Sequence, residues 1–580
     1  MTSDTPWFPL LVGAVCAPLV VAMVVLAGDG WHPTGDMAQA ELHVRGFFAH
    51  PPLLGAAGRF GTIAEQGSHP GPAPWLVLLP GYRLLGQSGW ALEASAAALA
   101  AGSAVGILAI ARRRGGWALT VTAALGLAVL IRSNGPEVFT EPWNPWLAVL
   151  PFAAFVLLVW SVLCDDRPAL VWAVVAGSFA VQSHIGYALM VGGLGAIAAA
   201  WALRRRWWRP LAIGALAGVL LWLPPVIEQL GAGDGWPGNA RILWDDLSGR
   251  DQEPLGVTAA IETFAEELNI AGPWLIGHDH EPTEMPVWPG LIAMSALWGA
   301  AAAVAWRRRL DHQLRLHAVL AVACALGIAT IARISGDFFY YLIRWTWVLS
   351  ALVAVAVGWT AWTAANDQWR RGLAKGAGAA LAAALIAASV GAVDVESSGE
   401  RNSEIVAALT PRVAERLDGD GQYLVRWTDN ISLGAAGVGV LLELEKRGFD
   451  VGTDAPHRAA VLPHRIVGRE CTTDGIIEIV VGSSVDDVRR RPGAEEVAIH
   501  DPRNAVERRR FDETAARLDA ALRKAGAEDL TPAADHVLVV IRVDPRLPKT
   551  SRDDLHTLYE LGLPAHAFVM PPPPCDPPSS

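Results

Sequence analysis

The sequence predicts a polytopic α-helical membrane protein with about eleven transmembrane helices and a C-terminal α/β domain. Three observations predict this fold class. The 580-residue chain is 52% hydrophobic and only 18% charged, against about 25% charged residues in soluble domains. Its apolar residues form long runs as far as about residue 394, where the composition becomes that of an ordinary globular domain. Arginines gather on alternate connections between the apolar runs.

Apolar runs of about twenty residues are long enough to cross a bilayer as helices. The first run is not followed by a convincing signal-peptidase site, which favours a spanning helix over a cleaved signal peptide. The fifth run is short, and its boundary with the sixth is weak. The predicted spans are 8–28, 90–111, 117–132, 146–163, 169–183, 185–203, 211–227, 289–306, 316–334, 343–362 and 374–393.

Arginine clusters predict the orientation, because connections rich in arginine stay in the cytoplasm. Eleven spans then place the N-terminus in the cytoplasm and the C-terminal domain outside, in a multi-pass protein of the plasma membrane. The first outer loop and the C-terminal domain are thereby expected on the same side. The clusters that fall on alternate connections are 112–114, 167, 204–209, 307–315 and 370–371.

The predicted domain boundaries follow from the change in composition. A transmembrane domain covers 1–394, with outer loops at 29–89 and 228–288. An extracytoplasmic α/β domain covers 395–570, and a Pro-rich tail, expected to be extended or disordered, covers 571–580. In the α/β domain, predicted helices at 401–416, 432–447 and 504–525 alternate with predicted strands at 422–427, 476–481 and 536–543.

Two further patterns lie in the C-terminal domain. Cys471 and Cys575 form a disulfide if the domain is extracytoplasmic; two free thiols are the alternative. The Gly-rich stretch 434–439 (GAAGVG) lacks a phosphate-binding fingerprint after a strand, so we interpret it as helix packing.

The first outer loop carries the most informative polar residues. A predicted helix, expected to lie at the membrane surface, places Asp36, Gln39 and His43 on one face. Glu41 and Arg45 lie on another face, where they can form an ion pair at the surface. Further along, His50-Pro51-Pro52 and His69-Pro70-Gly71-Pro72 can each start a short helix, since proline suits the first helical turn.

These residues resemble the GT-C superfamily of membrane glycosyltransferases. The resemblance rests on Asp36 within TGDMAQAELHVRGFF, on the HPGP stretch 69–72 and on YRLLG at 82–86, with EPWNPW, QSH, WLPP and YLIRWTW further along. It covers the membrane part well and the C-terminal domain only loosely. It implies a polyprenyl-phosphate-sugar donor, an acceptor at the outer face, and a catalytic aspartate at position 36. Many members carry two closely spaced acids at this point, whereas Met37 follows Asp36, which leaves a divalent metal requirement open.

Sugar transfer needs a carboxylate near the acceptor hydroxyl and cations or donors for the departing phosphate. Asp36 is the candidate for the first role, with Glu41 as a further acid. Arg344 is the main candidate for the second, because the guanidinium plane binds phosphate oxygens in pairs. The other candidate substrate-binding residues are Arg45, Arg59, His69, His184, Tyr340 and Tyr341.

Each candidate residue also has a structural interpretation. Asp36 follows Thr34-Gly35 and can simply cap a helix. Arg344 can extend to lipid headgroups, and His69 and His184 can stabilise turns. The triplet 278–280 (HDH) lacks a third ligand on a shared face, and we predict no metal site. No cofactor is predicted with certainty.

The sequence thus predicts a glycosyltransferase that moves one sugar from a polyprenyl-phosphate donor to a glycan or lipid-linked acceptor of the cell envelope. A lipid-linked-sugar transporter is one alternative, but apart from Glu93 the spans carry almost no charge, and transporters need polar groups inside the bilayer. A non-catalytic scaffold for envelope assembly is the other alternative. Membrane lipid is an expected partner, and the absence of a basic tract argues against nucleic acid.

Overall fold

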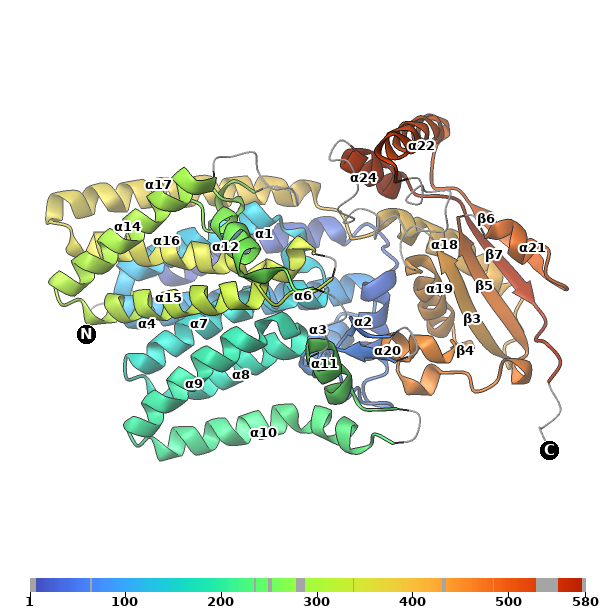
Figure 1. The fold of residues 1–580 in the computed structure, drawn as a ribbon, viewed down its shortest axis with the longest axis horizontal. Helices are drawn as coiled ribbons and strands as arrows, with labels where there is room; N and C mark the ends of the chain where they lie inside the picture. The colour runs from blue at the N-terminus through green and yellow to red at the C-terminus, as the bar shows by residue number, and fades with distance from the viewer. Residues whose placement is uncertain are drawn as a thin grey trace. The chain divides into compact units, whose positions relative to one another are not determined.

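A computed structural model describes residues 7–575, except 63–64, 234–235, 249–252, 278–286, 337, 430–433, 483 and 528–550. The chain divides into two compact units (Figure 1). A membrane unit comprises residues up to 29, then 53–55 and 69–397. A second unit, here called the α/β unit, comprises residues 30–52, 56–68 and 398 onwards.

The membrane unit is a bundle of long apolar helices. Among the described residues, nine helices are long and apolar enough to cross a membrane. One of them contains two predicted spans, because Gly116, with φ of +62°, interrupts it. Another predicted span, at 169–183, is the 17-residue helix α8. These nine helices, with α8 as a tenth, are α1 (Trp7–Leu26), α4 (Gly89–Asn134), α7 (Val149–Leu163), α8 (Arg167–Ser183), α9 (Ala188–Arg204), α10 (Trp208–Leu230), α14 (Val287–Arg307), α15 (Asp311–Ile331), α16 (Trp345–Ala364) and α17 (Asp367–Gly391). All eleven predicted spans thus coincide with helical segments.

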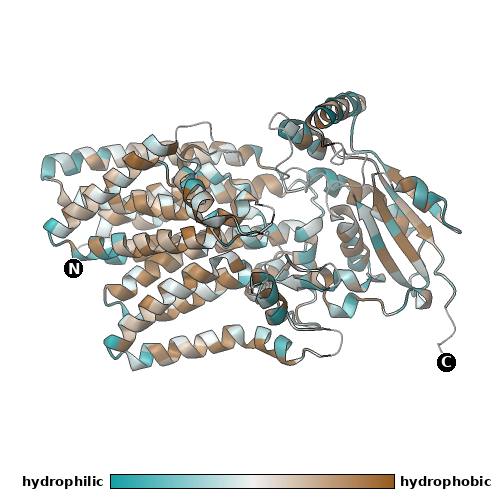
Figure 2. Ribbon diagram, in the orientation of Figure 1, coloured by the Kyte–Doolittle hydropathy of each residue, from teal (hydrophilic) through white to brown (hydrophobic). Residues whose placement is uncertain are grey.

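The outer helices of the bundle expose many apolar side chains, whose contact with water would be unfavourable. Along α10, Ile213, Leu216, Val219 and Leu220 are each 46–63% exposed, and the helix is apolar along most of its length (Figure 2). An exposed apolar surface of this extent marks contact with a partner or a membrane. Together with the length of the helices, it identifies a multi-pass membrane protein.

Hydrogen bonds join the arginine-rich connections to one another. Arg205 donates to the carboxylate of Asp165 at 2.8 Å, and the side chain of Arg113 pairs with Asp166. Arg315 donates to the carbonyl oxygen of Leu163 at 2.6 Å. These connections therefore lie at one end of the bundle, as the alternation of arginines requires.

Short helices lie in the other connections, which are not rich in arginine. They are α3 (Ala73–Leu84), α5 (Glu137–Thr140), α6 (Asn144–Leu147), α11 (Asn239–Ser248), α12 (Gly256–Glu267) and α13 (Pro273–Ile276), with 3-10 turns η1 (Ile185–Tyr187) and η2 (Tyr340–Ile343).

The α/β unit is built on a five-stranded mixed sheet in the order β4-β3-β5-β7-β6. Strands β3 (Gln422–Asp429), β4 (Asp450–Gly452) and β5 (Gly475–Val481) are parallel, and β7 (Ala565–Met570) runs antiparallel to β5 and β6 (Glu495–His500). Alternate residues of β5 are buried on opposite faces. Ile477 and Ile479 face one core, which includes residues of α18 (Glu400–Ala414) and α19 (Ala435–Lys446), whereas Ile476 and Val480 face a smaller core beside α21 (Val485–Arg489) (Figure 1).

The predicted elements of this domain are largely present. α18, α19 and α22 (Ala505–Ala525) occupy the predicted helical ranges, and β3 and β5 occupy two predicted strands. The predicted strand at 536–543 lies outside the described residues. The sequence did not predict β4, β6, β7 or α24 (Arg552–Leu561).

Two local predictions for this domain are confirmed. Cys471 and Cys575 form a disulfide, with Cα atoms 5.0 Å apart, and it ties the proline-rich segment to the domain. The Gly-rich stretch serves helix packing, since a Cβ atom at Gly434 or Gly437 would come within 2.4 Å of the Trp427 side chain.

The first outer loop is divided between the two units. Its helix α2 (Gly35–Arg45) and the hairpin β1 (Ala57–Gly61) and β2 (Gln66–Ser68) belong to the α/β unit, whereas residues 53–55 and 69 onwards belong to the membrane unit. The inner face of α2 is part of the core of the α/β unit. Ala38 and Leu42 are fully buried in the same core as Val406 and Leu441.

Candidate functional site

Five of the predicted substrate-binding residues belong to the membrane unit, and four of these form a continuous row. The rings of His69 and His184 are 4.7 Å apart, and Tyr341 stands edge-on to His184 at 6.4 Å. Tyr341 also contacts Trp143 at 4.8 Å. Through the Trp143–Trp146 pair, the row reaches Arg344. Tyr340 instead packs edge-on against Phe338, because successive residues of the 3-10 turn point in different directions.

Arg344 is a buried cation between aromatic rings. It is 5% exposed, and its guanidinium carbon lies 4.0 Å from the centre of the Trp347 ring and 5.2 Å from that of Trp146. Aromatic faces stabilise a cation and keep the guanidinium plane in a fixed orientation. The burial rules out the interpretation that this side chain simply extends to lipid headgroups.

The two histidines are held in defined orientations by the backbone. The amide of Ile185 donates to Nδ1 of His69, and the amide of Gly186 donates to Nδ1 of His184, each at 3.2 Å. Burial, together with the neighbouring His184, lowers the pKa of His69 well below its usual value, and burial lowers the pKa of His184 to about 4. Both rings are therefore neutral at pH 7 with the proton on Nε2. They can donate one hydrogen bond each but do not supply positive charge.

The EPWNPW and QSH segments position this row. Glu141 Oε2 accepts a hydrogen bond from Nε1 of Trp146 at 2.8 Å, and Asn144 Nδ2 donates to the carbonyl of Ser183 at 3.0 Å. Gln182 accepts from the amide of Ala73 and donates to the carbonyl of Leu221. Segments that are distant in sequence thus fix one aromatic and polar cluster.

Glu267 is a functional candidate that sequence reasoning missed. It lies at the end of α12, is 3% exposed, and accepts a hydrogen bond from Thr346 Oγ1 at 3.1 Å. Burial raises the pKa of Glu267 to about 7, although the positive charge of Arg344 acts in the opposite direction. A carboxyl group that titrates near neutrality beside a buried arginine can control the charge of that site. The sequence pattern that could have indicated Glu267 is an acidic residue on the apolar face of an amphipathic helix in an outer loop.

The other four predicted residues, Asp36, Glu41, Arg45 and Arg59, belong to the α/β unit. Asp36 lies in the first turn of α2 and is exposed, and its Oδ1 accepts a hydrogen bond from Gln39 Nε2 at 3.3 Å. His43 is buried on the same helix, with Nδ1 2.7 Å from the carbonyl of Gln39. A carboxylate at this position is stabilised by the helix dipole. The N-cap residue of α2 is Thr34 and not Asp36.

Glu41 and Arg45 contact the C-terminal domain. Glu41 is fully buried, with Oε1 2.7 Å from Nζ of Lys446, and Arg45 lies 3.5 Å from the carboxylate of Glu445. The helical spacing had suggested that Glu41 and Arg45 form an ion pair at the surface. This prediction is wrong, because Glu41 is fully buried. Arg59 is an exposed residue of β1.

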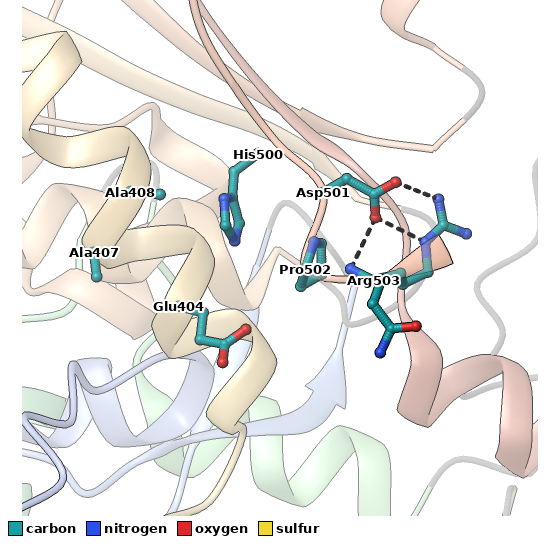
Figure 3. Close-up of a pocket in the computed structure, with 8 residues that line it drawn as sticks. Glu404, Ala407, Ala408, His500, Asp501, Pro502 and Arg503 are labelled. Carbon is teal, nitrogen blue, oxygen red and sulfur yellow. Dashed lines mark hydrogen bonds and ion pairs between the residues drawn. The ribbon is translucent and has the colours of Figure 1, made fainter. Parts of the chain in front are cut away.

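A shallow hollow of about 640 Å³ lies elsewhere in the α/β unit, between α18 and the segment after β6 (Figure 3). His500 and Glu404 line it, and Asp501 is held by hydrogen bonds from Arg503 (Figure 3). It contains none of the predicted site residues. Across the described ranges, no group of three or more His, Cys, Asp or Glu side chains could hold a metal ion, and the triplet 278–280 lies outside those ranges.

Comparison with solved structures shows a similar overall fold. The chain is similar to ArnT from Cupriavidus metallidurans bound to undecaprenyl phosphate, with a TM-score of 0.54 and 16% identity over 86% of this chain and 97% of that one. It is also similar to the same protein in the apo state, with a TM-score of 0.51 and 15% identity over 85% and 96% of the two chains. No protein-family model and no curated protein matches the sequence. The fold of this chain is therefore similar to that of ArnT.

Proposed function

We propose that this GT-C-fold protein is a membrane glycosyltransferase that moves a sugar from a polyprenyl-phosphate donor to an acceptor of the cell envelope. The observation that carries the proposal is the buried Arg344, which contacts two indole rings and lies in the same row of aromatic contacts as the neutral donors His69 and His184. A fixed guanidinium is suited to a phosphate whose negative charge grows as the glycosidic bond breaks. The solved structure of ArnT with undecaprenyl phosphate supports the choice of donor class.

In this proposal Asp36 orients and deprotonates the acceptor hydroxyl. Asp36 is the exposed residue of a helix whose other residues are buried or half-buried. Its side chain therefore does not serve to pack the helix against the rest of the unit. Arg344 holds the donor phosphate, with Tyr341 and the two histidines beside it. The arginine pattern supports a plasma-membrane orientation with the C-terminal domain and the acceptor outside. The proposal does not specify a hexosyl or a pentosyl donor.

The test is Asp36→Asn in the full-length protein, reconstituted in lipid. We expect loss of sugar transfer with donor binding retained, because the amide has the same shape but cannot accept the proton. Glu65→Gln is the matched control, since Glu65 is an exposed acid of the same outer loop. Wild-type rates in Asp36→Asn would refute the catalytic role, and equal losses in both variants would indicate a general effect of charge.

A further inference from the structure

Helix α2 is built into the α/β unit although it precedes the C-terminal part of that unit, which begins at residue 398, by more than 350 residues. The indole Nε1 of Trp31 donates to the carbonyl of Ser398 at 2.9 Å, and the hydroxyl of Ser403 accepts from the amide of His32 at 2.8 Å. The start of the segment is therefore fixed to the start of α18.

The start of α2 and the residue Pro33 before it pack closely against α19. A Cβ atom at Gly439 would lie 3.0 Å from the carbonyl oxygen of Pro33 and 2.6 Å from Val406. A Cβ atom at Gly35 would lie 3.4 Å from that of Ala435. Small residues on α19 thus let the first turns of the two helices approach each other.

A buried charge cluster fixes the middle of α2. The ammonium of Lys446 lies 2.7 Å from Glu41 and 2.9 Å from Glu443, and Glu443 lies 3.3 Å from Nδ1 of His32. Burial opposes the ionised form of Glu443, but the hydrogen bonds and charges of His32 and Lys446 lower its pKa to about 2. One lysine at the end of α19 therefore binds a carboxylate of α2 and one of its own helix.

The end of α2 is held by Arg465. Its Nη2 donates to the carbonyl of Leu42 at 3.4 Å, and the same guanidinium contacts both carboxylate oxygens of Glu445 at 2.5 and 2.9 Å. Leu42 is in the last turn of α2, and its carbonyl oxygen also accepts a hydrogen bond from the amide of Gly46 at 3.2 Å. Both ends and the middle of the helix are thus attached to the C-terminal domain.

Rotation of α2 about its axis decides where Asp36 points. Glu41 follows Asp36 by five residues, which is about 140° around a helix. Glu41 is fully buried and Asp36 is exposed. A contact that holds Glu41 inward therefore holds Asp36 outward.

We propose that Lys446 is a positioning residue, which acts through Glu41 to hold α2 in the rotation that presents Asp36 to the acceptor. The inference rests on the proposed catalytic role of Asp36 and assigns a purpose to the C-terminal domain. In this proposal, the C-terminal domain holds the catalytic helix α2 in a fixed orientation. Lys446 makes no contact with substrate in this role.

The experiment is Lys446→Met, which keeps the length of the side chain and removes its charge. We expect kcat, expressed per donor-binding site, to fall about tenfold to a hundredfold, because small displacements of a catalytic group have effects of this size. The donor KM stays within about twofold, since the proposed donor site is in the other unit. The matched control is Arg447→Met, because Arg447 is the next cation along the helix and is exposed.

Three additional variants separate positioning from a folding defect. Lys446→Arg restores most of the rate. The double variant Glu41→Gln with Lys446→Met recovers part of it, since removing both charges leaves no unpaired carboxylate at position 41 of α2. In the Asp36→Asn background, Lys446→Met lowers the residual rate no further, because the two residues act at the same step.

Each outcome either supports or overturns the inference. Wild-type kcat in Lys446→Met, with Asp36→Asn inactive, overturns the positioning role and leaves the proposed function intact. A further loss in the Asp36→Asn background also overturns it. Wild-type activity in Asp36→Asn overturns the proposed catalytic role itself, whatever Lys446→Met does.

Discussion

Replacing Arg344 by lysine keeps a positive charge in the membrane unit and removes the planar guanidinium. The native side chain is 5% exposed and lies 4.0 and 5.2 Å from two indole rings. Lysine retains the attraction to the rings in part, but it cannot form two parallel hydrogen bonds with a phosphate. Arg344→Lys therefore tests geometry separately from charge.

We expect Arg344→Lys to lose one charge-assisted hydrogen bond to the donor phosphate, which contributes about 1.5–3 kcal/mol to the binding free energy. This corresponds to a rise of about tenfold to a hundredfold or slightly more in the dissociation constant of the donor. The measurement is binding of polyprenyl phosphate to the purified protein, together with the donor KM. Because the phosphate also gains charge in the transition state, we expect kcat to fall as well.

Arg333→Lys is the control for this experiment, since Arg333 is an exposed arginine of the connection that also contains Arg344. We expect its donor affinity to equal that of the wild type. Unchanged affinity in Arg344→Lys, or equal losses in the two variants, would refute the assignment of the donor phosphate to Arg344.

Two other predictions concern stability and pH. Cys471→Ser opens a disulfide that spans 104 residues, for which chain entropy predicts a loss of about 4–5 kcal/mol; a lower apparent Tm of the C-terminal domain checks this, and an unchanged Tm contradicts it. Glu267 is buried and its pKa is about 7, so it becomes an anion as the pH rises through neutrality and then competes with the donor phosphate for Arg344. We expect the donor KM to rise between about pH 6 and 8 in the wild type and to stay flat in Glu267→Gln; a parallel rise in both would contradict the coupling.

The membrane unit was predictable because its signals are local. A span needs only a sufficient run of apolar residues, and the alternation of arginines adds a second, independent pattern. Even the short span at 169–183 is present as α8. The break between two spans at Gly116 was also marked, by the arginines and glycines of ARRRGG.

The parts that were not predictable depend on contacts between distant residues. Nothing near Glu41 in the sequence indicates that its partner is Lys446, about 400 residues later. Strand β6 reads EEVAIH and has no alternation of apolar and polar residues, and its pairing with β7 includes a register shift between Glu496 and Ala498. Glu267 looked like a residue of a polar loop, and its burial depends on the packing of α12 against α16.

The candidate site shows the same division. Arg344, Tyr341, His69 and His184 were selected one by one from their segments, and their aromatic contacts join them into one row. The role of Trp146 and Trp347 as faces for Arg344 was not predicted, because interface tryptophans are expected in any membrane protein.

The most direct test of the central claim is a mass-spectrometric comparison of envelope glycans from cells with the gene, without it, and with the Asp36→Asn variant. The account predicts that one sugar residue is missing from an envelope glycan or lipid-linked glycan in cells without the gene. The wild-type gene restores that sugar and Asp36→Asn does not. Identical glycans in all three strains, or full restoration by Asp36→Asn, would contradict the account.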